Sequence, residues 1–146
     1  MAGPQFSTSG PAHAARPKRR FTLELANRSL PLVKRIVSDI VHTHADAAKA
    51  RQELERQPAN GKGRPAQEAQ ARLEAALTRL EDYLDELSEV GCELKDFQMG
   101  LIDFVGRHQG RDVCLCWKLG EEKVTHWHEL DAGYSGRQPV SKLEER

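Results

Sequence analysis

The stretch DVCLCWKLGEEKVTHWHE, residues 112–129, decides the fold of this 146-residue chain. Apolar and polar residues alternate on both sides of a central Gly-Glu-Glu, which predicts strands at 112–119 and 123–129 joined by a turn at 120–122. A slip of one residue would mix polar and apolar side chains on both faces, so this turn length is favoured. Cys116 then lies opposite His126 and Cys114 opposite His128. One face is expected to cover helices with Val113, Leu115, Trp117, Leu119, Thr125 and Trp127, and the other to face outward with Cys114, Cys116, Lys118, Val124, His126 and His128.

The outward face of this hairpin is a candidate metal site. Thiolates and imidazoles together suit zinc or another divalent metal, and His-x-His on a strand is a recurrent ligand spacing. The alternative is a surface with two ordinary histidines and two small thiols, because the Cys-x₂-Cys spacing of common zinc modules is absent. The zincin motif is excluded, since position 132 is Ala132 where a second histidine would be needed. The candidate ligands are His128, His126, Cys116, Cys114, Glu129 and Asp131.

Upstream of the hairpin, the spacing of apolar residues changes from two to three and four. Residues 101–105 continue the strand pattern, whereas 31–57 and 66–90 carry amphipathic stripes typical of helices, separated by a Pro- and Gly-rich loop at 58–65. Thr22 is a suitable N-cap for a short helix at 23–29, which Pro31 is expected to end, and Gly91 is a suitable C-terminal stop. The sequence therefore predicts an α+β fold: a long antiparallel helical hairpin with a short N-terminal helix, then a small antiparallel sheet of about three strands.

Composition limits the classes of protein to consider. The chain has 22 Lys+Arg, 22 Asp+Glu and 38% apolar residues, so neither a general polyanion binder nor a specific nucleic-acid binder is expected. No apolar run approaches the roughly 20 residues that cross a bilayer, so no membrane association is expected. Three cysteines without a secretory segment predict a cytoplasmic protein. Residues 1–20 are expected to form a disordered basic tail, 21–140 a single domain (helical hairpin 21–90, sheet and Gly-rich loop 91–140), and 141–146 a polar terminus.

Several stretches beyond the hairpin resemble one family. These are Phe21-Thr22-Leu23-Glu24, Glu93-Leu94-Lys95-Asp96, Gly100-Leu101-Ile102-Asp103-Phe104 and the long segment from Trp127-His128-Glu129-Leu130-Asp131-Ala132-Gly133 to Pro139. Together they resemble domain of unknown function 2203, a family of uncharacterised prokaryotic proteins. The resemblance implies a bacterial source and no particular activity. It marks as motif positions His128, Glu129, Asp131, Arg137, Lys95, Asp96 and Asp103.

Three functions are compatible with these features. The first is a small metal- or anion-binding module on the hairpin and its following loop, where Arg137 offers a fork for a carboxylate or phosphate and Lys95, Asp96 and Asp103 are further candidates. The second is an interaction protein that forms a homo-oligomer, because a small sheet cannot cover two helices of about 38 Å. The third is a small metal-dependent hydrolase, for which the sequence positions no nucleophile or base.

Overall fold

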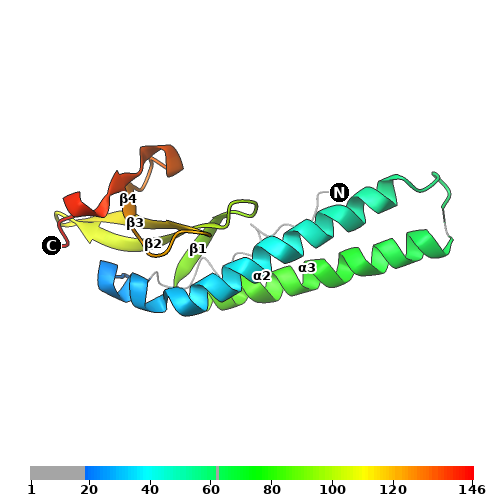
Figure 1. Cartoon of the computed structure of the whole chain (residues 1–146), viewed down its shortest axis with the longest axis horizontal. Helices are drawn as coiled ribbons and strands as arrows, with labels where there is room; N and C mark the ends of the chain where they lie inside the picture. Colours follow the sequence, from blue (N-terminus) through cyan, green and yellow to red (C-terminus); the bar gives the residue numbers. More distant parts are fainter. Residues whose placement is uncertain (1–18, 62) are drawn as a thin grey trace.

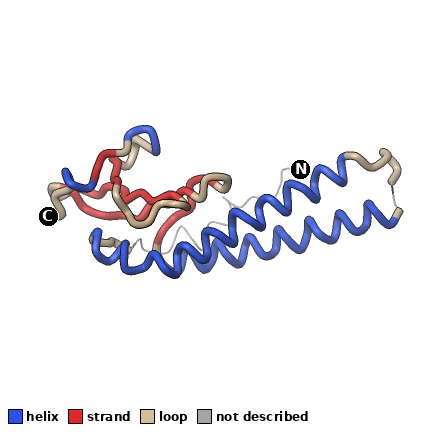
Figure 2. Tube along the Cα trace, in the orientation of Figure 1, coloured by secondary structure: helices blue, strands red, loops and turns tan. Residues whose placement is uncertain are grey.

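The computed structural model describes residues 19–61 and 63–146. Two long helices, α2 (Leu23–Glu55) and α3 (Arg64–Val90), form an antiparallel hairpin (Figure 1). Five strands follow: β1 (Cys92–Asp96), β2 (Leu101–His108), β3 (Arg111–Lys118), β4 (His126–Glu129) and β5 (Gln138–Pro139). They make one antiparallel sheet in chain order, with short 3-10 turns η1 (Tyr134–Gly136) and η2 (Val140–Lys142) near its last strand. The sheet lies against one end of the hairpin, and the loop end of the hairpin extends beyond it (Figure 2).

The predicted break before Pro31 is wrong, because α2 runs through this proline. A proline inside a helix removes one hydrogen bond and costs about 3 kcal/mol. Pro31 itself is exposed, whereas Leu30 and Val33 beside it are buried against the sheet. Packing of this half of the helix therefore outweighs the lost hydrogen bond. The predicted cap at Thr22 is confirmed, since its hydroxyl oxygen accepts from the backbone N–H of Leu25 at 3.1 Å.

Gly91 ends α3 and turns the chain into the sheet. Its φ of +112° is in the left-handed region, and a Cβ at this position would lie 3.1 Å from the ring of Phe21. Both the backbone angle and the close contact therefore require glycine here. The strand that follows, β1, was not predicted, although residues 92–95 (Cys-Glu-Leu-Lys) alternate apolar and polar side chains and their burial alternates in the same way. A run of four residues is too short to distinguish a strand from a turn.

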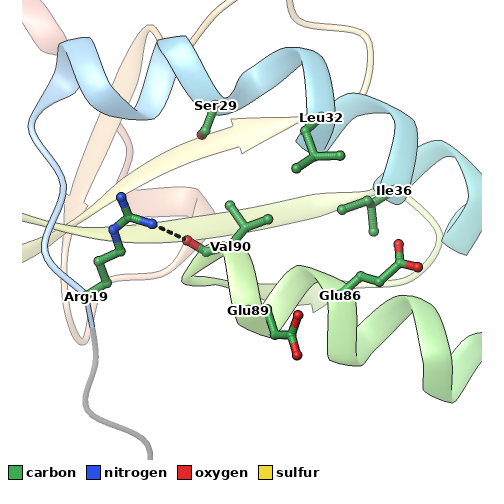
Figure 3. A pocket seen from close by; sticks show the side chains of 7 residues that line it. All are labelled: Arg19, Ser29, Leu32, Ile36, Glu86, Glu89 and Val90. Carbon is green, nitrogen blue, oxygen red and sulfur yellow. Dashed lines mark hydrogen bonds between the residues drawn. The ribbon is translucent and has the colours of Figure 1, made fainter.

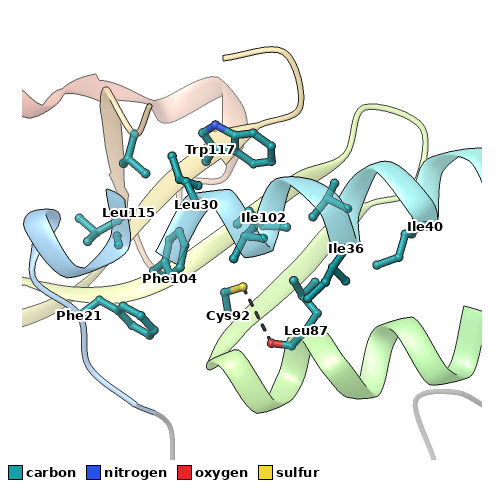
Figure 4. Close-up of a cluster of buried hydrophobic side chains, with 14 of the residues drawn as sticks. Phe21, Leu30, Ile36, Ile40, Leu87, Cys92, Ile102, Phe104, Leu115 and Trp117 are labelled. Carbon is teal, nitrogen blue, oxygen red and sulfur yellow. Dashed lines mark hydrogen bonds between the residues drawn. The ribbon is translucent and has the colours of Figure 1, made fainter. Parts of the chain in front are cut away.

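The register of the β3–β4 hairpin confirms the predicted pairing of Cys114 with His128 and of Cys116 with His126. The predicted turn at 120–122 is wrong, because residues 119–125 connect the two strands, and Val124, expected on the outward face, is buried in the core. The inward face carries the main core, in which Phe104, Leu115 and Trp117 pack against α2 and α3 (Figure 4). The sheet has five strands rather than about three. Besides β1, the sequence missed β5, whose two residues lie in the Gly-rich segment and are too few to show a pattern.

Beyond the sheet, the two helices pack on each other through small side chains. Leu73 and three alanines form a separate buried cluster there, with Leu54 and Leu77 partly buried against it. Small residues allow close approach of two helix backbones, so the apolar stripes meet within the hairpin. The alanines of this cluster are Ala47, Ala50 and Ala76.

Among the described residues, no helix is long and apolar enough to cross a membrane.

Both ends of the described chain contact the sheet. Residues 1–18 of the expected tail lie outside the described residues, but Arg20 bridges to Val105 and pairs with Asp112 at 2.9 Å. Arg20, which was assigned to this tail, therefore contacts β2 and β3. At the other end, Glu145 accepts a hydrogen bond from the backbone N–H of Leu23 at the start of α2.

Candidate metal centre

Three potential metal ligands meet on the outward face of the sheet. They are Asp103 from β2, Cys114 from β3 and His128 from β4, and their ligand atoms lie within 4.8 Å of one another. Strand pairing explains the meeting, because Asp103 pairs with Cys116, and Cys114 pairs with His128. The outward face is not open at this point: His128 is 2% exposed, Asp103 6% and Cys114 7%.

The hydrogen bonds of His128 fix the orientation of its ring. Nδ1 lies 2.7 Å from the carbonyl oxygen of Glu129. A carbonyl only accepts, so Nδ1 carries a proton and donates it. Nε2 then faces Oδ1 of Asp103 at 3.1 Å. One further proton must lie between these two atoms, held either by the imidazole ring or by the carboxyl group.

Both thiols on this face are held in the neutral form. Burial raises the pKa of Cys114 to about 12, and the neighbouring Asp103 carboxylate contributes in the same direction while Lys95 opposes it. Burial and Asp103 also raise the pKa of Cys116 to about 12, with Arg137 opposing. A thiol with such a pKa is a poor nucleophile at neutral pH. A bound cation would reverse this, because coordination deprotonates a thiol outright.

Two cationic side chains flank the cluster. Burial alone would lower the pKa of Lys95, but the hydrogen bond and charge of Glu93, together with the charge of Asp103, raise it. On the other side, Nη2 of Arg137 donates to Glu121 at 2.9 Å and lies 3.5 Å from the carbonyl oxygen of Cys116. Lys95 therefore interacts with Asp103 and Cys114 of the cluster, whereas Arg137 interacts with the neighbouring Cys116.

The structure separates some predicted ligands from this cluster. His126 shares the face, but its Nδ1 interacts with the hydroxyl of Thr125 at 2.9 Å. Glu129 follows His128 and so points to the opposite face, where it pairs with Arg111. Asp131 is exposed in the turn after β4. Asp96 caps the β1–β2 turn by accepting from the backbone N–H of residues 98 and 99. None of these four is among the three residues that meet.

Asp103 was predicted as a binding residue but not as a metal ligand. The sequence Gln109-Gly110 is a signal that could have identified Asp103 as a metal ligand, because a two-residue turn is expected there. Such a turn pairs His108 with Arg111, as the structure shows. Counting back from that pair places Asp103 opposite Cys116.

A separate shallow groove lies on the helices, away from this cluster. It encloses about 500 Å³ and is lined by residues of both helices and by Arg19, with acidic side chains at one side (Figure 3). Leu32 in this groove is 45% exposed, an unusually open position for a large apolar side chain. Its lining includes Leu32 and Ile36 of α2 and Glu86 and Glu89 of α3.

Comparison with known proteins gives one match. A family model described as an uncharacterized conserved protein (DUF2203) matches residues 19–140. No curated protein and no solved structure matches the chain.

Proposed function

Since the chain belongs to the DUF2203 family, which is described only as uncharacterized, we propose its function from the buried cluster: it binds one divalent metal ion, with zinc favoured. The ligands are an oxygen of Asp103, the sulfur of Cys114 and Nε2 of His128. The observation that carries this proposal is the convergence of these atoms within 4.8 Å, from three neighbouring strands. A mixed oxygen, sulfur and nitrogen set suits zinc better than calcium or magnesium, which prefer oxygen alone.

The fit of the cluster to zinc can be judged from bond lengths. Zinc–ligand bonds of about 2.0–2.3 Å in a tetrahedron place neighbouring ligand atoms about 3.3–3.8 Å apart. Nε2 of His128 is 3.1 Å from Asp103, and no pair of the three ligand atoms is more than 4.8 Å apart, so shifts of about 1 Å bring all three to these separations. The hydrogen bond that Nδ1 of His128 donates to the Glu129 carbonyl supports a role for His128 as a zinc ligand. Zinc-bound histidines commonly donate their other N–H to an oxygen in this way.

Charge balance also supports a cation here. Asp103 and a Cys114 thiolate would carry two negative charges at positions less than one tenth exposed. Lys95 offsets part of this charge, and a divalent cation would compensate the rest, whereas without one the Cys114 thiol must keep its proton. Three protein ligands leave a fourth position for water or a substrate, as in catalytic zinc sites.

The three cysteines are free thiols, which supports placing the protein in a reducing cytoplasm.

The proposal can be tested by metal titration of the full chain after removal of metals with a chelator. Zinc affinity is measured by competition with a chromophoric chelator, and cobalt is used as a spectroscopic probe. Cys114→Ser should weaken zinc at least about tenfold and abolish the cobalt–thiolate absorption. Cys116→Ser is the matched control, because Cys116 lies on the same strand and face. It should retain both properties. Equal affinity in wild type and Cys114→Ser would overturn the proposal.

A second candidate function is association with another protein or a second copy through the helical hairpin. The groove around Leu32 favours it, because this leucine is 45% exposed between two buried stripes. Sedimentation velocity of wild type and Leu32→Glu at tens of micromolar tests it. A monomeric wild type would exclude self-association through this surface.

A further inference from the structure

Arg137 has a hydrogen-bond donor that the described residues do not use. Its side chain is only 11% exposed, and Nη2 is bound by Glu121. Nε is buried, yet it has no hydrogen-bond partner. Buried donors on charged groups are almost always paired with protein, water or an ion. The free Nε therefore marks a place where an acceptor is missing.

A second cation lies beside the same aromatic ring. Nζ of Lys118 is 3.3 Å from the hydroxyl of Tyr134 and 5.6 Å from its ring centre, and the guanidinium of Arg137 is 5.0 Å from that centre. Among the described residues, Lys118 forms no ion pair and its Nζ contacts the hydroxyl of this tyrosine, whereas Arg137 pairs with Glu121. Lys118 therefore adds a positive charge beside Arg137 that no carboxylate of the described residues pairs with.

The carboxylate of Glu121 does not occupy Nε of Arg137, which is buried without a partner among the described residues. Its Oε1 accepts both from Nη2 of Arg137 and from the backbone N–H of Lys118 at 2.9 Å. Glu121 is therefore held at one end of the guanidinium. Because Nε is buried, an oxyanion reaches it only when a neighbouring side chain moves, and the ring of Tyr134, which is 39% exposed and lies 5.0 Å from the guanidinium, is one that can move.

We propose that Arg137 and Lys118 form a subsite for the oxyanion of a small acidic ligand, a carboxylate or a phosphate. Arg137 contacts the backbone of Cys116, which pairs with Asp103 of the metal cluster, so the ligand is held beside that cluster. The proposal deepens the proposed function by naming the class of ligand, and it rests on that function for the role of the metal. A planar guanidinium fork is the side chain best suited to a carboxylate or phosphate.

Calorimetric titration of the full chain with inorganic phosphate and, separately, with acetate tests this subsite. Both titrations are made at low ionic strength on metal-free and on zinc-loaded protein. We expect a Kd of about 1 mM or tighter for one of the two anions. The tighter anion identifies the ligand as phosphorylated or as a carboxylic acid.

Two variants and one control assign the binding to these residues. Arg137→Lys keeps the positive charge and the pairing with Glu121 but removes the guanidinium fork. Lys118→Gln removes the second positive charge at a residue that is only partly buried. Each should weaken the anion at least about tenfold. Arg111→Gln removes an arginine on the opposite face of β3 and should bind the anion like wild type.

The results separate this proposal from the metal proposal. Anion binding by wild type without any zinc binding would retain the subsite and overturn the metal centre. Zinc binding with no response to either anion at 10-fold the expected Kd, about 10 mM, would overturn the subsite alone. Equal anion affinity in wild type and both variants would also overturn it.

Discussion

Nε2 of His128 lies 3.1 Å from Oδ1 of Asp103, and these side chains expose only 3% and 6% of their surface. The other ring nitrogen of His128 donates to a backbone carbonyl. The pair therefore encloses one proton that water does not readily reach. A metal ion that binds both atoms must displace this proton, and it must also take one from Cys114. This relationship makes proton release the most direct signature of the proposed site.

Zinc binding should release about two protons near neutral pH, one from the His128–Asp103 pair and one from the Cys114 thiol. Because protons compete for the same atoms, affinity should fall as the pH is lowered and rise as it is raised. Calorimetric titrations in buffers with different ionisation enthalpies measure the number of protons. A zinc affinity that is the same at about pH 6 and about pH 8 would contradict this assignment.

Asp103→Asn should weaken zinc at least about tenfold, because the amide is a poorer ligand than a carboxylate. It should also lower the free energy of unfolding of the metal-free protein by about 1–3 kcal/mol, since His128 loses its charged partner in a buried position. Chemical denaturation and chelator competition measure the two effects. Asp131→Asn is the control, because Asp131 is exposed and should change neither quantity.

Cys114 and Cys116 should react slowly with iodoacetamide in the folded protein. Burial raises their pKa from 9.0 to about 12. The thiolate fraction at pH 7.5 is then about a thousandfold smaller than for an unshifted thiol. Mass spectrometry of timed reactions measures this, with protein unfolded in urea as the reference. Modification of both thiols at the unfolded rate would show that they are neither buried nor shifted.

Ala76→Leu should destabilise the hairpin by about 1–3 kcal/mol, because Ala76 is 1% exposed in the cluster between the helices and has no room for a larger side chain. Ala71→Leu is the matched control. It makes the same change on the same helix at an exposed position and should stay within about 0.5 kcal/mol. Urea unfolding measures both. Equal stabilities would show that the helices do not pack closely at this level.

The parts of the fold that the sequence predicted are those set by local rules. Apolar alternation was enough to place Cys114 opposite His128, since a shifted register would have mixed polar and apolar side chains on both faces, although the turn between the strands is longer than predicted. Thr22 and Gly91 were recognised as helix ends because each supplies a specific bond or backbone angle. Where tertiary packing overrides a local rule, prediction failed. Pro31 is the example, because the contacts that keep α2 continuous come from the distant sheet.

The candidate site was predicted less completely than the hairpin. Cys114 and His128 came from one hairpin, so their meeting followed from one register. Asp103 comes from another strand, and its place depends on the β2–β3 register. The Gln109-Gly110 turn sets this register, but only when the strand predicted at 101–105 is extended to that turn. The burial of the outward face was not predicted either. Arg137, which contacts the backbone of Cys116, comes from an irregular segment whose position cannot be derived from a residue pattern.

The order of the strands has a consequence for the kinetics of folding. Each strand pairs with its neighbour along the chain, and the two helices form a hairpin, so most native contacts join nearby residues. Such topologies close only short loops and fold quickly. The exceptions lie at the start of α2, where the backbone N–H of Phe21 bonds to Val105 and that of Leu23 to Glu145. Docking of this helix end onto a formed sheet closes the longest loops in the molecule. It is therefore the step expected to limit the folding rate, and substitutions at Phe21 should slow folding more than equally destabilising substitutions in the far end of the hairpin.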